Sequence, residues 1–187
     1  MTFTARLLEE FLAADPVAVA PELLGMRLRT RFEGAVTEVA ITEVEAYAGE
    51  GDPASHTARG PTPRNRPMYG PAGTLYVYRS YGLHWCMNVV TGPAGVPGAV
   101  LVRGGMPRRG AEVMAQRRGR DDHLSDGPGK LCAALGVTGE HDATSVLTGP
   151  VRLLDRVEPP PRYRASARIG ITRAVDRPWR FVAEPSH

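Results

Sequence analysis

Short segments in which apolar and polar residues alternate are the feature of this sequence that most limits its fold. They span residues 26–32, 37–47, 74–81 and 84–90, and glycines or prolines separate them. A period of two is typical of strands with one buried face. Gly34 indicates a turn before the longest segment, and Gly82 predicts a hairpin between the last two. Such tight connections favour antiparallel pairing.

Helical periodicity is weaker and is confined to short stretches. Leu7, Leu8, Phe11 and Leu12 predict an amphipathic helix over 4–14. Further helices are expected over 16–24, where Gly25 ends the segment, over the basic stretch 108–118, and over 129–135. Shorter strands are expected near 99–103, 151–154, 166–172 and 179–183. We therefore predict one α+β domain over 1–187, with a curved, mainly antiparallel sheet and flanking helices.

Composition narrows the class of protein further. The chain has 187 residues, of which 42% are hydrophobic, so it can build one real core. We expect no membrane partner, because no apolar run reaches the length of a spanning helix and the N-terminus does not resemble a signal peptide. Cys86 and Cys132 lack partners at metal-site or disulfide-framework spacing, and a reducing compartment is expected. None of the five histidines forms a ligand pair, so we expect no metal and no cofactor.

The segment 37–47 carries unusual chemistry for a strand. Unbroken alternation would place Val39, Ile41, Glu43, Glu45 and Tyr47 on one face. A face that begins apolar and ends with two carboxylates and a tyrosine is predicted to leave the core and enter a site.

A stretch rich in glycine and proline, residues 49–73, follows without any periodic pattern. A loop of that length in a compact domain is usually functional or disordered. Three arginines lie between Arg59 and Arg66, and five of the six tyrosines lie between Tyr47 and Tyr81. Positive charge beside aromatic planes suits phosphates and stacked bases. The net charge of +3 is compatible with nucleic acid without requiring it, and the tyrosines could equally be ordinary strand residues.

Several uncommon blocks make the sequence specific. They are Glu43-Val44-Glu45-Ala46-Tyr47, His56, Thr62-Pro63-Arg64-Asn65-Arg66, Gly73-Thr74-Leu75-Tyr76-Val77-Tyr78, Tyr81-Gly82, Cys86-Met87-Asn88, Leu101-Val102-Arg103, Gly127-Pro128-Gly129-Lys130-Leu131-Cys132 and Arg168-Ile169-Gly170-Ile171. In this order and spacing they resemble the alkyladenine (3-methyladenine) DNA glycosylase family, from about residue 20 onward. The resemblance implies double-stranded DNA containing a damaged purine as the partner.

The resemblance implies a general base at Glu45. A carboxylate there would deprotonate the attacking water and stabilise the cationic sugar. Arg103 and the backbone carbonyl of Ile169 are the groups implied to help hold the water. Glu43 shares the predicted face of Glu45, and it is the family pattern, not strand geometry, that favours Glu45.

The same pattern assigns the walls of a pocket for the extruded base. Tyr47, His56 and Tyr78 match its aromatic walls, which would stack on electron-poor alkylated purines. Asn88 matches the residue that rejects normal guanine by crowding its exocyclic amino group. Taken alone, His56 would be a loop histidine that caps a backbone group, and Asn88 an ordinary edge or turn residue.

The hairpin is expected to protrude and enter the DNA minor groove. Tyr81 at its tip resembles the wedge that fills the gap left by the flipped nucleotide, and Leu83 would assist it. Arg64 and Arg66 would contact phosphates or brace the loop, and the sequence does not separate these two roles.

Lys130 is the only lysine of the chain. A glycosylase with lyase activity needs an amine to form a Schiff base, and the matching family lysine is not that nucleophile. Lys130 is expected to support DNA binding or the local fold at a helix start. We therefore predict a monofunctional, monomeric enzyme that leaves an abasic site, in the cytoplasm with the nucleoid if bacterial and in the nucleus if eukaryotic.

Two alternatives remain open at this level. The chain could be a non-catalytic module that binds damaged DNA, or a hydrolase of free nucleosides, which would need neither the Tyr81 wedge nor salt-sensitive DNA binding. The chain also departs from the family pattern at Val44, at His84-Trp85 and in the Gly/Pro connection 92–98, which could shift lesion preference.

Overall fold

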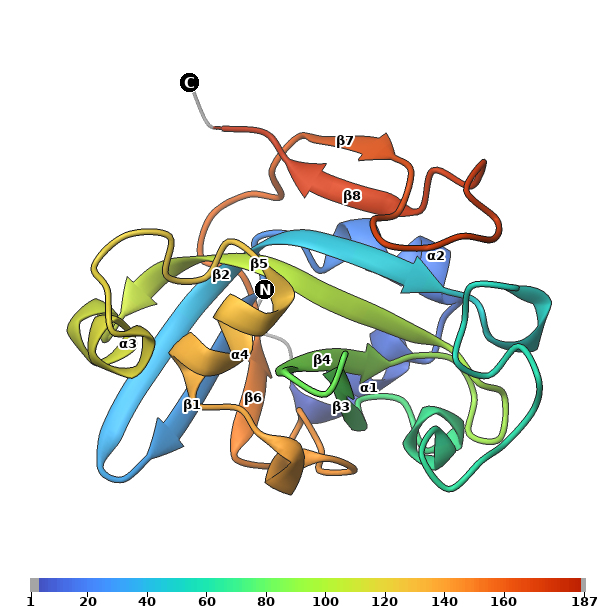
Figure 1. The fold of residues 1–187 in the computed structure, drawn as a ribbon, viewed down its shortest axis with the longest axis horizontal. Coiled ribbons are helices and arrows are strands. Elements are labelled where there is room, and N and C mark those ends of the chain that lie inside the picture. Colours follow the sequence, from blue (N-terminus) through green and yellow to red (C-terminus); the bar gives the residue numbers. More distant parts are fainter. Residues whose placement is uncertain (1–3, 186–187) are drawn as a thin grey trace.

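A computed structural model describes residues 4–185 and shows an α+β fold with a curled antiparallel sheet (Figure 1). The helices are α1 (Ala5–Leu12), α2 (Pro16–Glu22), α3 (Ala111–Arg118) and α4 (Pro128–Leu135), with short 3-10 turns at Gly49–Gly51, Arg66–Tyr69 and Gly139–His141. The strands are β1 (Arg27–Phe32), β2 (Ala35–Tyr47), β3 (Leu75–Ser80), β4 (His84–Val90), β5 (Ala99–Arg109), β6 (Val151–Leu154), β7 (Tyr163–Ser166) and β8 (Arg180–Ala183). The fold class predicted from the sequence is thereby confirmed.

The sheet is organised around β2. Its strand order is β3-β4-β5-β2-β1-β6, and β7 and β8 extend it on the side where β8 pairs with the second half of β2. One edge of β2 thus pairs with β5 along most of its length, while the other edge pairs first with β1 and then with β8. In Figure 1 the C-terminal end of β2 lies beside both the 49–73 loop and the segment that connects β7 to β8.

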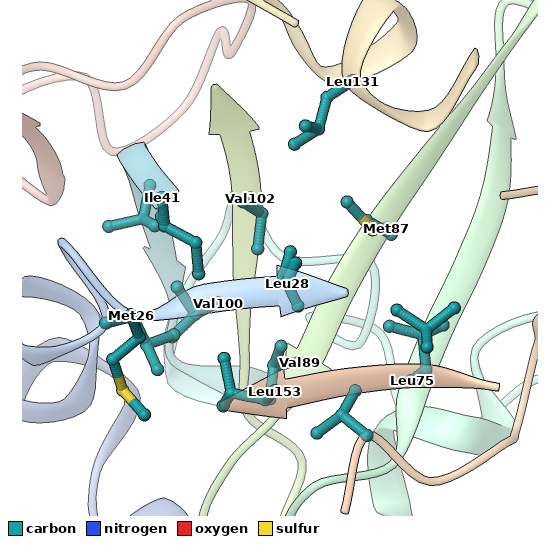
Figure 2. Close-up of a cluster of buried hydrophobic side chains, with 14 of the residues drawn as sticks. Met26, Leu28, Ile41, Leu75, Met87, Val89, Val100, Val102, Leu131 and Leu153 are labelled. Atoms are coloured by element: carbon teal, nitrogen blue, oxygen red, sulfur yellow. The ribbon is translucent and has the colours of Figure 1, made fainter. Parts of the chain in front are cut away.

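One face of the curled sheet encloses the hydrophobic core. Side chains from β1, β2, β4, β5, β6 and α4 point toward one another, with Leu28, Ile41, Met87, Val102 and Leu153 among them (Figure 2). Helices α1 and α2 close the same core with Leu8, Leu12 and Val19. A buried aliphatic side chain contributes roughly 1.5–3 kcal/mol of transfer free energy, so this face anchors the sheet and leaves the opposite face available for polar residues.

The prediction of which β2 side chains share a face is wrong in one respect. The register of β2 against β5 is irregular around Thr42, between the pairs Ile41↔Gly105 and Val44↔Val102. Thr42 of β2 and Arg103 of β5 have no partner in this register, and the bulge reverses the alternation along β2. Ile41 faces the core before the bulge and Val44 faces it after the bulge. Glu43, Glu45 and Tyr47 therefore share a face with one another but not with Val39 and Ile41.

Three boundaries also differ from expectation. β5 continues to Arg109, so α3 begins only after Gly110, whose φ of +72° favours glycine and whose Cβ would lie 2.4 Å from the Val36 carbonyl oxygen. β7 covers Tyr163–Ser166, not 166–172, because residues from Arg168 onward contact β2 and the 49–73 loop instead of a neighbouring strand.

Among residues 4–185, the helices are all too short or too polar to cross a membrane.

Candidate active site

The floor of the site is the outer face of four adjacent strands, β3, β4, β5 and β2. Where Leu75 and Val77 of β3 point to the core, Tyr76 and Tyr78 point to the opposite face, and the other three strands follow the same alternation. The strand registers place Tyr76, Asn88, Leu101 and Glu45 in one row across the sheet. Side chains that are far apart in the sequence therefore meet on a rigid surface.

A cleft of about 570 Å³ lies over this floor. Its rim is formed by the hairpin tip between β3 and β4, the 49–73 loop and residues 169–171. Eight of the twelve predicted site residues line it, namely Tyr47, His56, Arg64, Tyr78, Tyr81, Asn88, Arg103 and Ile169. The cleft falls in the size range typical of small-molecule sites and mixes aromatic with polar walls.

Glu45 lies directly beneath the cleft and has 0% exposed surface. Three donors hold its carboxylate: the backbone N–H of Ile169 donates to Oε1 over 2.7 Å, while Tyr47 Oη and Arg103 Nη1 donate to Oε2 over 2.9 and 3.3 Å. All three donor residues line the cleft. Ile169 thus reaches the carboxylate through its amide N–H, whereas the sequence resemblance implicated its carbonyl in water binding.

Glu43, the rival carboxylate, has a different environment. Its Oε1 accepts hydrogen bonds from Arg103 Nε over 2.9 Å and from Arg180 Nε over 2.7 Å. Arg103 therefore bridges both glutamates with two different nitrogens. Neither glutamate is itself part of the cleft lining, but all three donors to Glu45 are, whereas of the two donors to Glu43 only Arg103 is. Glu43 therefore fixes Arg103 from outside the cleft.

The aromatic walls are braced by hydrogen bonds. His56 Nδ1 lies 2.9 Å from Tyr76 Oη, and the rings of His56 and Tyr78 meet edge to face with centroids 4.5 Å apart. Partial burial, with a smaller effect from the charge of Arg64, lowers the pKa of His56. Burial, reinforced by the neighbouring Glu45, raises the pKa of Tyr47. His56 is thus held neutral and Tyr47 is held as a hydrogen-bond donor near neutral pH.

Asn88 is buried on the floor in the same row as Glu45. Its Nδ2 donates to the Tyr76 carbonyl oxygen over 3.1 Å. This bond fixes the orientation of the amide, so that any ligand in the cleft meets a fixed polar side chain.

The hairpin tip presents two apolar side chains to solvent. Tyr81 is 90% exposed and Leu83 is 73% exposed. Tyr81 has a φ of +49° and Gly82 has a φ of +69°, and Leu83 N donates to the Ser80 carbonyl oxygen. Positive φ at both central residues is typical of the tight turns that join twisted strands, although it is uncommon for tyrosine. Exposed apolar groups on a strained turn favour a binding role over a packing role.

Besides Arg103, three predicted site residues are positively charged, and of these only Arg64 lines the cleft, whereas Arg66 and Lys130 lie outside the lining. Arg64 donates to the Arg79 carbonyl oxygen over 3.1 Å and lies 5.6 Å from the Tyr78 ring centroid, so it braces the loop against the hairpin. Arg66 is exposed on a 3-10 turn. Lys130 lies in the first turn of α4 and pairs with Asp126 at 3.0 Å; it does not line the cleft, although Pro128 of the same turn does.

Known proteins with similar sequences show to which family the chain belongs. A sequence profile described as methylpurine-DNA glycosylase matches residues 10–187. A curated relative in Methanoculleus marisnigri is 49% identical over 182 residues and covers 94% of each chain. A relative in Agrobacterium fabrum is 46% identical, covering 99% of this chain and 92% of its own, and one in Chlorobaculum parvum is 45% identical, covering 97% and 90%. All three carry the name "Putative 3-methyladenine DNA glycosylase".

The chain belongs to the methylpurine-DNA glycosylase family. Membership confirms the family that the sequence blocks indicated and makes the chain a DNA glycosylase.

Two structural features of this glycosylase were missed by the sequence reasoning. Asn65 is buried and ties the 49–73 loop together, accepting from Thr62 N and donating to the carbonyl oxygens of His56 and Gly60. Asp52 forms a buried ion pair with Arg168. Asn65 and Arg168 both occur in the sequence blocks that carry the family resemblance. Neither the spacing nor the periodicity of the sequence shows which residues they contact.

Proposed function

We propose that this glycosylase removes alkylated or deaminated purines from duplex DNA by hydrolysis of the N-glycosidic bond. The class of substrate is that of 3-methyladenine, 7-methylguanine, hypoxanthine and ethenoadenine, and the product is an abasic site. The observation that carries the proposal is a single one: the Glu45 carboxylate is held by three donors at the floor of an aromatic cleft whose rim ends in an exposed tyrosine.

Glu45 can serve as the base while remaining covered from bulk solvent. Oε1 accepts one hydrogen bond from protein and can accept a second. Because Glu45 has 0% exposed surface, the proposal requires the residues above it to shift and admit a water when DNA binds. That water would attack C1′ of the sugar, pass a proton to Glu45, and displace the purine, which takes the electron pair of the broken bond. The carboxylate also offsets the positive charge that develops on the sugar.

The walls of the cleft suit a damaged purine. Tyr78, His56 and Tyr47 all contribute aromatic rings to its lining. Stacking on an aromatic ring contributes about 1–3 kcal/mol per base, and a cationic alkylated base gains more. An alkylated purine leaves as a neutral base, whereas hypoxanthine must be protonated as it departs. Asn88, whose amide is held by its hydrogen bond to the Tyr76 carbonyl oxygen, would clash with the amino group of normal guanine.

The surface around the cleft suits duplex DNA. Tyr81 and Leu83 project from the hairpin tip, where they could replace the stacking lost when a nucleotide is flipped. A second hollow of about 450 Å³ adjoins the cleft and shares Ala54, His56, Gly170 and Ile171 with it. Arg59 and Arg173 line that hollow, so the approach to the cleft is positively charged.

The position of Lys130 supports water as the nucleophile. It is the sole lysine, and it pairs with Asp126 at the start of α4 instead of lining the cleft. Without an amine in the cleft, a Schiff base with the sugar would lack a side-chain nucleophile. We therefore propose a monofunctional enzyme.

Excision assays test the proposal against its two alternatives. Duplexes carrying 7-methylguanine, hypoxanthine or ethenoadenine should release the free base, and the strand should stay intact until alkali cleaves the abasic site. Undamaged duplexes provide the control, and binding should weaken as salt rises. Binding without release would identify a damaged-DNA-binding module. Release from free nucleosides at rates equal to those on duplexes would identify a nucleoside hydrolase.

A further inference from the structure

The buried ion pair between Asp52 and Arg168 lies behind the cleft. Both side chains have 0% exposed surface. Arg168 Nη1 contacts Oδ2 at 2.5 Å and Nη2 contacts Oδ1 at 2.9 Å, so the pair is bidentate. Burial alone would raise the pKa of Asp52, but hydrogen bonds from Arg168 and from two backbone amides lower it, so the carboxyl group stays charged at neutral pH.

Two aromatic rings enclose the same guanidinium. Arg168 Cζ lies 4.7 Å from the centroid of Tyr47 and 5.1 Å from that of Trp179. Arg168 Nη1 also donates to the Ala46 carbonyl oxygen over 2.9 Å. A planar cation with bidentate and stacking contacts is held in one orientation, which a lysine could not reproduce.

The pair connects three segments that each supply part of the site. Asp52 accepts hydrogen bonds from the Ala48 and Ala54 amides, which set the start of the loop that carries His56. Arg168 contacts the end of β2 at Ala46 and Tyr47.

The third segment begins one residue after Arg168. There, the Ile169 amide donates to Glu45 Oε1 over 2.7 Å. Two of the three donors to Glu45, Tyr47 and Ile169, are thus fixed by contact with Arg168 or by direct linkage to it.

We propose that Asp52 and Arg168 form a positioning pair that sets the orientation of the Glu45 carboxylate. The inference rests on the proposed function and deepens it by assigning residues that touch neither base nor sugar. A buried ion pair is often no more stabilising than apolar residues of the same volume. Its distinctive contribution here is directional, because it fixes two neutral donors that hold different oxygens of one carboxylate.

Asp52→Asn and Arg168→Lys test the proposal. Asp52→Asn keeps the shape but removes the charge, and Arg168→Lys keeps the charge but loses the bidentate and stacked geometry. Each should lower the single-turnover excision rate at saturating enzyme by about 10²-fold, because small displacements of catalytic groups have effects of that size. The dissociation constant for an uncleavable lesion duplex should change little.

Glu38→Gln is the matched control. Like Asp52, Glu38 is a buried carboxylate paired with arginine, here Arg27 and Arg29. It lies on β2 and does not line the cleft. The substitution should lower the melting temperature and leave the excision rate near that of the wild type when both are assayed well below melting.

A second measurement separates positioning from general damage to the cleft. In a Glu45→Gln background, Asp52→Asn should cause no further loss of the residual excision of 7-methylguanine, because the carboxylate on which it acts is already gone. An equal further loss would overturn the proposal.

The remaining outcomes are also decisive. If Asp52→Asn does not fold, Arg168→Lys alone carries the test, and wild-type rates in it would overturn the positioning role. Failure of the wild-type chain to release any base would instead overturn the proposed function.

Discussion

Two buried glutamates on the same strand illustrate what separates a structural carboxylate from a candidate catalytic one. Glu38 lies in the first half of β2, and Arg27 and Arg29 hold its two oxygens at 3.0 and 2.6 Å. Glu45 lies in the second half, beyond the bulge, and has one arginine contact together with a tyrosine hydroxyl and a backbone amide. Both are nearly inaccessible to solvent.

The difference lies in how the charge is balanced. Two guanidinium groups more than neutralise Glu38, so its carboxylate has little remaining basicity to offer. Glu45 shares its single arginine, Arg103, with Glu43, and its other two donors are neutral. Neutral donors orient a carboxylate without cancelling its charge, and the donors to Glu45 line the cleft whereas the arginines that hold Glu38 do not. Burial and an arginine partner alone would not have distinguished the two.

Replacing each glutamate with glutamine should give the largest contrast. Glu45→Gln should lower excision by about 10³-fold, since general-base catalysis contributes 10²–10⁴-fold, and should keep lesion binding. Single-turnover release from a hypoxanthine duplex measures the rate, and Glu38→Gln serves as the control. Normal excision by Glu45→Gln together with an inactive Glu43→Gln would transfer the base assignment to Glu43.

Part of this contrast could be predicted from the sequence. Period-two alternation identified the strands, and a glycine marked the turn of the β3–β4 hairpin, since both are local properties. The bulge at Thr42 was not predictable, because it depends on how β5 pairs across from it. The sequence therefore placed Glu45 on the same face as Ile41, although the structure places them on opposite faces.

Long-range contacts were accessible only through the family resemblance. Ile169 meets Glu45 across a separation of 124 residues, and Arg168 meets Asp52 across 116. Periodicity carries no information at that range. The resemblance brought Ile169 into the predicted site, but it offered no role for Asp52, whose contribution is visible only once the chain is folded.

Removing the Tyr81 side chain tests the rim of the cleft, as the glutamate substitutions test its floor. Tyr81→Ala should slow excision from duplexes by about tenfold, because extruding a nucleotide costs a few kcal/mol that the wedge partly offsets. Excision from single-stranded substrate and the melting temperature should hold steady, since the side chain is 90% exposed. Val157→Ala, also at an exposed apolar residue, is the matched control. Equal rates for Tyr81→Ala and wild type on duplexes would remove Tyr81 from the flipping step.

The smallest expected effect concerns stability in acid and returns to Glu38. Burial by itself would raise the pKa of Glu38, but its hydrogen bonds to Arg29 and Arg27 outweigh burial and hold the pKa below the usual 4.5. A carboxylate whose pKa is lower in the folded state stabilises the protein above the unfolded pKa, and this contribution is lost as pH falls through the folded value. Glu38→Gln should therefore lower the free energy of unfolding by about 2 kcal/mol near neutral pH.

The difference between Glu38→Gln and wild type should then shrink as the solution is acidified below about pH 4. Urea unfolding at a series of pH values measures it. Glu10→Gln is the control, because Glu10 pairs with Arg6 on the exposed surface of α1 and an exposed pair contributes little at any pH. A destabilisation of Glu38→Gln that stays constant into acid would show that Glu38 acts through packing and not through its charge. In that case the electrostatic distinction between the two halves of β2 would no longer hold.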